Sequence, residues 1–381
     1  MARIVFGSYM VRYPLGGVLS SSLQWLVGFH RMGHDLYFVE KSGWADACYD
    51  PAKSVMSDDC SYGTRTLHEL LARFGLEDRW CFVDADGRYH GLSRERIEAL
   101  FRSADVFVDR GTHGAWLEEA AHCGLRVYVD GEPGMRQMRM ENSLAAGETL
   151  PEYDFYFTTG RNVGTARSSA PTAGKAWRPI THPVVAELFS PLPGGDGAAF
   201  TTVMNWQSYE PIRFRGDVFG HKDVEFEKFI DLPHGTSVPM EIAVSGKKLP
   251  VERLRRAGWR VLDAHEVTAS VDSYWEYISC SRGEFSVCKS GFVKTNNGWF
   301  SDRSSAYLAS GRPVVQQDTG FGDHLPCGEG LMAVRTAEEA AAAIEEIAGN
   351  YERHSRRARE IALEHLEASK VLGRFLRELG L

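Results

Sequence analysis

The sequence has no C-x-x-C pair, and its cysteines are odd in number. Seven cysteines are scattered along 381 residues, which suits reduced thiols and indicates neither a disulfide framework nor a structural zinc site. No stretch approaches the ~18 consecutive apolar residues that a membrane-spanning helix needs, and the apolar run at the N-terminus is too short for a signal peptide. We therefore expect a cytoplasmic protein with no membrane span and no metal.

The chain also lacks an excess of basic residues. It has 43 Lys and Arg against 51 Asp and Glu, a formal net charge of -8. This balance argues against a general nucleic-acid binder and leaves a small anion as the partner of any local basic cleft. Hydrophobic residues make up 43% and charged residues 25% of the chain, as in a globular protein. Because single cores stop growing near ~250–300 residues, the length predicts two domains.

Strand and helix patterns alternate twice along the chain, as in two doubly wound parallel sheets. Strands are predicted in the first half at 3–8, 35–39, 106–108 and 126–129, and in the second half at 200–204, 240–244, 259–262, 284–288 and 313–316. The first helix is predicted to have its N-terminal cap at 20–22, and the Pro- and Gly-rich stretch 190–198 to be a linker. The sequence thus predicts an α/β fold with Rossmann-like domains at 1–188 and 189–350, followed by a helical tail at 351–381.

The segment 284–322 has the features of a phosphate site. It places a basic, Gly-punctuated loop before a predicted helix at 301–310. A helix N-terminus offers unpaired N–H groups and about half a positive charge, so it holds anions, and Gly298 allows close approach of the backbone. A plain strand-loop-helix turn with surface cations has the same pattern. The cations that would face a diphosphate are Lys289, Lys294 and Arg303.

Acidic residues end two predicted strands of the first half. Asp109 and Asp130 stand at these ends, and His113 and Glu132 follow in the loops. The carboxyl ends of parallel strands form the edge where ligands bind, and carboxylates or His act there as general bases. Asp109 is the first candidate for a base and His113 the second, although each of the four alone is more often a helix or turn cap.

A Gly pair near the N-terminus could bring the backbone close to a ligand. Gly16 and Gly17 lie in the loop after the first predicted strand, where they would admit a donor or an acceptor, or simply form a tight turn. Arg12 stands just before them and would add a charge for phosphate from the opposite domain.

Two segments resemble the GT-B glycosyltransferases. GHDLYFVE at 33–40 is similar to that family's second strand, and AYLASGRPVVQQDTGF at 306–321 is similar to its AMACGKPVV-type segment. The resemblance implies two Rossmann-like domains facing a central cleft, with a C-terminal helix crossing back. It also implies a nucleotide-sugar donor in the second domain, an acceptor in the first, and transfer that needs neither a metal nor a cofactor.

The chain departs from this family at the donor site. Many retaining members have a pair of glutamates, whereas Asn297 or Gly298 and Ala306 stand at those positions here. We therefore assign Asp302 to a ribose or sugar hydroxyl, and Arg303 with Ser304 to phosphate.

The resulting expectation is a hexosyltransferase-type enzyme that uses a UDP- or TDP-sugar. It would act on a hydroxyl or amine of a small molecule, such as a bacterial secondary metabolite in antibiotic biosynthesis. A nucleotide-sugar 2-epimerase of the same fold is the alternative. Neither nucleic acid nor a membrane is expected as a partner, and a homodimer is left open.

Overall fold

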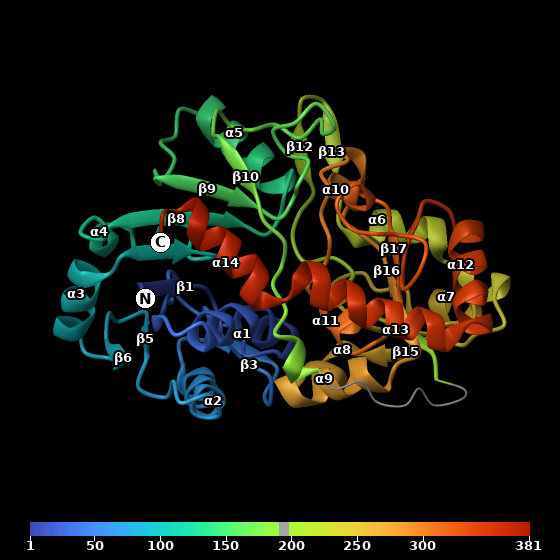
Figure 1. Cartoon of the computed structure of the whole chain (residues 1–381), viewed down its shortest axis with the longest axis horizontal. Helices are drawn as coiled ribbons and strands as arrows, with labels where there is room; N and C mark the ends of the chain where they lie inside the picture. The colour runs from blue at the N-terminus through green and yellow to red at the C-terminus, as the bar shows by residue number, and fades with distance from the viewer. Residues whose placement is uncertain (190–197) are drawn as a thin grey trace.

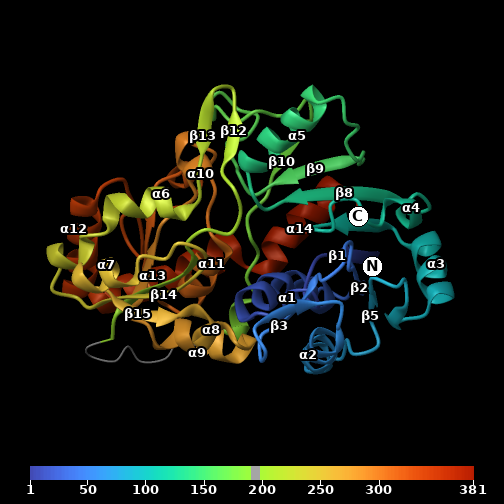
Figure 2. The same cartoon turned by 180° about the vertical axis from the view of Figure 1, so that it is seen from behind.

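The computed structural model describes residues 1–189 and 198–381. The predicted linker at 190–198 lies outside the described residues, apart from Ala198. Two mostly parallel sheets with helices on both faces form two halves that lie side by side (Figures 1 and 2). Each sheet has hydrophobic clusters packed against it, and this arrangement confirms two Rossmann-like halves.

The N-terminal sheet has the strand order β10-β9-β8-β7-β1-β2-β5-β6, and only the β5–β6 pair among its described pairings is antiparallel. The central strands are buried on both faces, which is why they read as unbroken apolar runs in the sequence. The strands are β1 (Arg3–Gly7), β2 (Asp35–Lys41), β5 (Trp80–Val83), β6 (Tyr89–Gly91), β7 (Val106–Asp109), β8 (Leu125–Asp130), β9 (Phe155–Thr158) and β10 (Trp177–Pro179). The helices are α1 (Gly16–Arg31), α2 (Ser61–Ala72), α3 (Arg94–Ser103), α4 (Leu117–Ala120) and α5 (Met135–Ala145), and a small ribbon joins β3 (Cys48–Asp50) to β4 (Val55–Ser57).

The C-terminal sheet is parallel and has the order β15-β14-β11-β16-β17-β18. Its strands are β11 (Phe200–Asn205), β14 (Met240–Ser245), β15 (Arg260–Asp263), β16 (Gly283–Ser286), β17 (Val314–Gln317) and β18 (Leu331–Val334). Its helices are α6 (Lys222–Phe226), α7 (Val251–Arg256), α8 (Ala264–Thr268), α9 (Val271–Cys280), α10 (Ser290–Lys294), α11 (Asp302–Ala309) and α12 (Ala337–Gly349). Each strand predicted in this half is present within two residues of its predicted ends.

The C-terminal tail crosses from the second half to the first. It runs through α13 (Tyr351–Ile361), a π-helical turn at Ala362–Leu366 and α14 (Ala368–Glu378), and α14 lies against the N-terminal half in Figure 1. Phe375 of α14 packs among three aromatic rings of that half, those of Trp25, Phe29 and Phe157. A Cβ at Gly28 of α1 would lie 2.6 Å from a Leu372 methyl, so the two helices meet closely. The predicted crossing helix is confirmed.

A β-hairpin forms a second connection between the halves. Strands β12 (Ile212–Phe214) and β13 (Asp217–Phe219) belong to the C-terminal half, and β12 contacts α5 of the N-terminal half. One apolar cluster joins them, made of Met135, Met138, Ile212, Phe214, Phe219, Cys288, Phe292 and Trp299. The hairpin and α14 therefore join the two halves at two separate places.

Two local predictions near the cleft were wrong. Helix α1 begins at Gly16 rather than at 20–22, and its N-cap residue Leu15 makes no side-chain hydrogen bond. The Gly pair therefore forms the first turn of a helix instead of a loop. The segment before α11 is likewise not all loop, because α10 occupies its first part.

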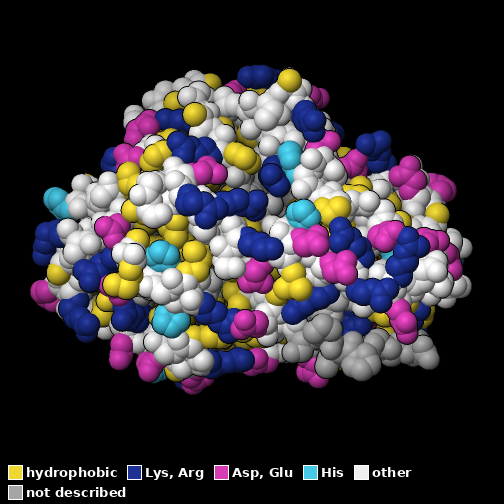
Figure 3. Space-filling model, in the orientation of Figure 1, with side chains coloured by type: hydrophobic (Ala, Val, Ile, Leu, Met, Phe, Trp, Pro, Cys, Tyr) yellow, Lys and Arg dark blue, Asp and Glu magenta, His cyan; other side chains and the backbone are white. Residues whose placement is uncertain are grey.

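The surface charge and the character of the helices can be compared with the expectation that neither nucleic acid nor a membrane is a partner. Figure 3 shows Lys and Arg interspersed with Asp and Glu over the face that α13 and α14 cross, which gives that face no single sign of charge. None of the described helices combines the length and the apolar character that a bilayer crossing requires.

Candidate functional site

A cavity of about 670 Å³ lies between the two halves. Its walls come from loops that follow β1, β7 and β8 in the first half and β11 and β16 in the second. These are the carboxyl ends of parallel strands, where open α/β sheets bind ligands. Three carboxylates and seven cations line it: Asp130, Glu132, Asp302, Arg12, Arg110, Arg136, Arg139, Lys222, Lys289 and Arg303. The balance of charge favours an anion.

Two helices begin at the cavity, one from each half. Gly17 and Val18 in the first turn of α1 line it, and so do Ser301 and Asp302 at the start of α11. Neither N-cap residue gives a side-chain hydrogen bond to its helix, and the first amides of any helix have no partner within it. The two N-termini therefore add positive potential and free N–H groups to the same space.

Lys222 is the cation best placed to meet an anion. It is the first residue of α6, is 9% exposed and lines the cavity. Within residues 1–189 and 198–381 it forms no ion pair with a carboxylate. Burial, with smaller effects of Arg303 and Lys289, lowers the pKa of Lys222 to about 7. A buried ammonium without a partner is costly, and a bound diphosphate would supply the missing negative charge.

Arg303 lines the cavity but is held by its own domain. It forms an ion pair with buried Glu284 and donates to Val203 O at 2.7 Å and to Ser286 Oγ at 2.7 Å. Burial alone would lower the pKa of Arg303, but Glu284 outweighs it and raises the pKa. These contacts occupy its Nε, Nη1 and Nη2 groups. The main role of Arg303 is therefore to hold α11 against strands β11 and β16.

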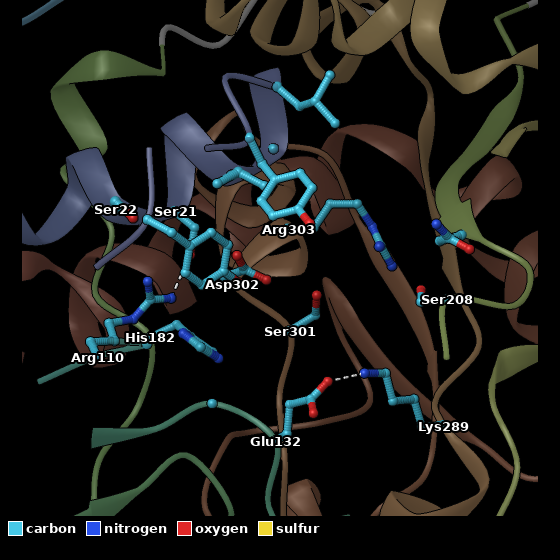
Figure 4. Close-up of a pocket in the computed structure, with 18 of the residues that line it drawn as sticks. Ser21, Ser22, Arg110, Glu132, His182, Ser208, Lys289, Ser301, Asp302 and Arg303 are labelled. Carbon is cyan, nitrogen blue, oxygen red and sulfur yellow. Dashed lines mark hydrogen bonds and ion pairs between the residues drawn. The ribbon is translucent and has the colours of Figure 1, made fainter. Parts of the chain in front are cut away.

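Lys289 and Glu132 form an ion pair across the cavity (Figure 4). Glu132 follows β8 of the first half, whereas Lys289 precedes α10 of the second. Glu132 also accepts from Arg139 at 2.9 Å and from Tyr209 Oη at 3.2 Å. Burial alone would raise the pKa of Glu132, but Lys289 and Arg139 outweigh it and lower the pKa to about 2. Glu132 is thus an ionised bridge between the halves and a poor proton acceptor.

Asp302 points from α11 toward the first half (Figure 4). It lies near His182, Ser21 and Arg110, and these groups outweigh the effect of burial and lower its pKa. Arg110 donates to Ser21 Oγ at 2.6 Å, while the buried Nε of Arg110 has no hydrogen-bond partner in the described chain. The ionised carboxylate of Asp302 and the Nε–H group of Arg110 are therefore available to polar groups of a ligand.

Two buried histidines face the cavity with both ring nitrogens unpartnered, as far as the described residues go. His182 follows β10 and is 5% exposed, and His221 precedes α6 and is 4% exposed. Burial lowers the pKa of His182 to about 4, and burial with Lys289 and Lys222 lowers that of His221 to about 3. Both rings are neutral at pH 7, and each offers one donor and one acceptor.

Asp109 does not face the cavity. It is fully buried, and its carboxylate accepts from the backbone amides of residues 111–114 and from Tyr153 Oη at 2.6 Å. These five hydrogen bonds occupy both oxygens, so the structure gives Asp109 a loop-organising role in place of the predicted base. The loop it organises carries His113, which lines the cavity in a left-handed conformation with φ 52°.

His113 offers an unprotonated ring nitrogen at the cavity, although its lowered pKa makes it a weaker base than a free imidazole. Desolvation in the cavity, followed by the effect of Arg136, lowers its pKa, so the ring is neutral at pH 7. Asp130, the other acid predicted at this edge, is 2% exposed and accepts from Gln137, Thr158 and the amide of Glu132. Asp130 thus holds the loop after β8, much as Asp109 holds the loop after β7.

Three predicted donor residues lie away from the cavity. Lys294 is exposed and donates to Val218 O at 3.2 Å, and Ser304 is buried and donates to Gln316 at 3.1 Å. Gly298 has φ +77°, and a Cβ there would lie 3.0 Å from Asn162 of the other half. Gly298 therefore packs the two halves together, and none of the three residues lines the cavity between them.

The Gly pair and Arg12 divide between packing and the cavity. A Cβ at Gly16 would lie 2.3 Å from Ser270 O, so Gly16 allows α1 to approach α9, while Gly17 lines the cavity. Arg12 also lines it, but it pairs with Glu40 at 2.9 Å and donates to Ser42 O at 3.4 Å. Its charge is therefore largely neutralised within the first half.

The sequence interpretation missed Lys222, His221, His182 and Arg110. Lys222 and His221 stand 17 and 16 residues beyond the end of β11, behind the β12–β13 hairpin, and no motif marks them. The one available signal was the length of the connection after a predicted strand, since long loops at this edge often bind ligands. Arg110 directly follows Asp109, and no sequence motif distinguishes it from other arginines at strand ends.

No family model matches the sequence, and no curated protein is similar enough in sequence to match it. Solved structures do match over essentially the whole chain. HepE from Anabaena in complex with UDP and glucose has a TM-score of 0.57 at 11% identity, covering 100% of both chains. AviGT4, a glycosyltransferase involved in avilamycin A biosynthesis, has 0.52 at 12%, covering 99% of this chain and 97% of its own.

An alpha-glucosyltransferase in complex with UDP and DNA has a TM-score of 0.59 at 10% identity, covering 100% of both chains. At such identities the likeness concerns the fold. The chain therefore has the GT-B fold, with two Rossmann-like halves facing a cleft and a C-terminal helix that crosses back.

Proposed function

We propose that this protein is a glycosyltransferase that takes a sugar from a nucleotide-sugar donor bound in the cleft. The observation that carries the proposal is Lys222, a buried cation with no carboxylate partner in the described chain, on a cleft where α1 and α11 both begin. A diphosphate is the kind of ligand that satisfies such a site. The UDP named for two of the similar structures supports a nucleotide as its carrier.

The donor is proposed to bind with its diphosphate near Lys222 and the first amides of α11. When the bond from sugar to phosphate breaks, negative charge grows on the leaving diphosphate, and fixed donors stabilise it. Because these donors are side chains and amides, the proposal includes transfer without a metal. Asp302 is proposed to accept from a ribose or sugar hydroxyl, and His182, with its unpartnered ring, to hold another hydroxyl. Arg303 supports this wall through Glu284.

The acceptor is proposed to bind on the wall formed by the first half. His113 lines that wall, and its lowered pKa keeps it neutral, so it replaces Asp109 as the proposed base. The acceptor's hydroxyl or amine gives up its proton to His113 as its new bond to the sugar forms and the bond to the diphosphate breaks. A UDP- or TDP-hexose and a small-molecule acceptor are proposed to share the cavity of about 670 Å³, a size typical of ligand sites. The role of AviGT4 in avilamycin A biosynthesis supports a secondary metabolite as one acceptor to try.

Turnover of nucleotide sugars tests this proposal. The protein should release UDP or TDP from the sugar nucleotide in the presence of a small-molecule acceptor, and mass spectrometry should find the acceptor heavier by one sugar. Clean interconversion of donor sugars without an acceptor would instead show the 2-epimerase of the same fold. A thermal-shift panel of UDP, TDP, GDP and ADP comes first, since a ligand at ~100 times its Kd adds about 2.7 kcal/mol to the unfolding free energy.

A further inference from the structure

Three side chains of types that can ligate a metal meet at the edge of the N-terminal sheet, outside the cleft. Cys60 stands just before α2, Asp84 follows β5, and His90 lies on β6. One ligand atom from each lies within 4.8 Å of the other two. None of the three residues lines the cavity between the halves.

The distances between these atoms suit a tetrahedral zinc ion. Cys60 Sγ lies 3.6 Å from His90 Nε2. Zn–S and Zn–N bonds of ~2.3 and ~2.05 Å at a tetrahedral angle put the sulfur and nitrogen about 3.6 Å apart. His90 Nε2 lies 2.9 Å from Asp84 Oδ2, against about 3.4 Å between nitrogen and oxygen ligands of one zinc. A small rotation of either side chain would admit the ion.

The surroundings hold the ligands in place and favour a cation. Asp84 Oδ1 accepts from the amides of Asp86 and Arg88 at 3.0 and 2.9 Å, which leaves Oδ2 directed at His90. The hairpin turn thus orients one ligand, as outer-shell hydrogen bonds do in metal sites. Asp59 stands beside Cys60 and adds a negative charge nearby. The side chain of His90 is 34% exposed, so solvent can supply a fourth ligand.

A histidine–aspartate hydrogen bond beside a buried cysteine is the simpler interpretation of this cluster. That interpretation accounts for the contact between Asp84 and His90. It gives no reason why Cys60 Sγ and Asp84 Oδ2 both lie close to the same nitrogen of His90. A soft thiolate, an imidazole and a carboxylate on three separate elements are a donor set that zinc uses. The sequence indicated no zinc site because the ligands are 24 and 6 residues apart, without a C-x-x-C pair.

We propose that Cys60, Asp84 and His90 bind one Zn²⁺ that ties the start of α2 to the β5–β6 hairpin, with water as the fourth ligand. The ion would cross-link an edge of the first sheet, because its ligands come from three elements. The site is independent of the proposed transferase activity, and its test does not rely on that activity.

The test is zinc retention by the full chain. After incubation with ZnCl₂ and desalting, elemental analysis should find about one zinc per wild-type chain. The Cys60→Ser and His90→Gln variants should bind zinc more than about 100-fold more weakly, since even loss of an outer-shell partner costs ~10–100-fold. Cys280→Ser is the matched control, because Cys280 is an exposed free cysteine far from the cluster in sequence, and it should retain zinc like the wild type.

Cobalt provides a readout that does not depend on the folding of a variant. Co²⁺ added to the wild-type chain should give a thiolate-to-cobalt charge-transfer absorption, and added Zn²⁺ should abolish it. Wild-type chains that retain no zinc and show no such absorption would overturn the proposal. Equal zinc retention by the wild type and a folded Cys60→Ser variant would overturn it as well, because the metal would then lie elsewhere.

Discussion

Replacing Lys222 with methionine should weaken diphosphate binding and stabilise the free protein. Lys222 is buried and has no carboxylate partner within the described chain. A hydrogen bond to a charged group contributes about 1.5–3 kcal/mol, so the Kd for UDP should rise roughly 10- to 150-fold in Lys222→Met. The Kd for uridine, which has no phosphate, should stay the same.

The effect on stability has the opposite sign. Burial lowers the pKa of Lys222 from 10.5 to about 7 on folding. Between these pH values the unfolded chain binds the extra proton, so the unfolding free energy rises with pH. Below pH 7 the folded state bears the whole cost of the buried charge, on the order of a few kcal/mol. Lys222→Met should therefore raise Tm at pH 6 and change it less at pH 9.

The pH dependence of UDP binding shows whether Lys222 acts through its charge or through the shape of its side chain. A bound diphosphate raises the pKa of Lys222, so above pH 7 binding must take up a proton. The Kd of the wild type for UDP should then rise about 15-fold between pH 7 and 8.5. Lys222→Arg stays charged over this range and should show a flat profile.

Calorimetric titration with UDP and uridine, together with thermal unfolding, measures both effects. Lys370→Met, an exposed lysine on α14, is the matched control and should change neither. The reasoning would be refuted if Lys222→Met bound UDP as tightly as the wild type. It would also be refuted if Lys222→Met bound UDP and uridine with equally reduced affinity, because Lys222 would then act on the pocket as a whole.

Three further predictions follow from contacts at the cleft. Lys289→Met breaks the ion pair across the cleft and should lower the unfolding free energy by about 1–3 kcal/mol, measured by urea denaturation; an unchanged value would show that the pair is not formed in solution. Gly16→Ala should lower Tm because the added Cβ would lie 2.3 Å from Ser270 O. Gly17→Ala should leave Tm unchanged, because its Cβ would make ordinary contacts of 3.7 Å or more. Equal effects of the two substitutions would contradict the close approach of α1 to α9. His113→Gln should reduce kcat by about 10²- to 10⁴-fold and leave the Kd for UDP unchanged, and wild-type turnover by this variant would remove His113 as the base.

The fold could be predicted from the sequence because buried strands have a recognisable residue pattern. Central strands such as β1 and β7 are covered on both faces, so they appear as short apolar runs between Gly and polar loops. The start of α1 was not predicted, since two glycines normally break a helix. Gly16 is tolerated there because only a residue without a side chain fits against α9, which is a contact between the two halves that no local pattern contains.

The site was harder to predict, because a residue type does not say where its side chain points. Asp109 and Asp130 were placed correctly at the sheet edge, but their oxygens are used by backbone amides and neighbouring side chains. His113, the second candidate, is the one that reaches the cavity. Lys222 escaped prediction because a hairpin separates it from its strand, and its isolation from carboxylates is a property of the folded chain alone.

The most direct test of the account is the structure of this protein bound to UDP. The account predicts the nucleotide in the cleft, with diphosphate oxygens within hydrogen-bond distance of Lys222 Nζ and of the first amides of α11. A nucleotide bound outside the cleft would contradict the account. So would one in the cleft whose diphosphate leaves Lys222 without a partner.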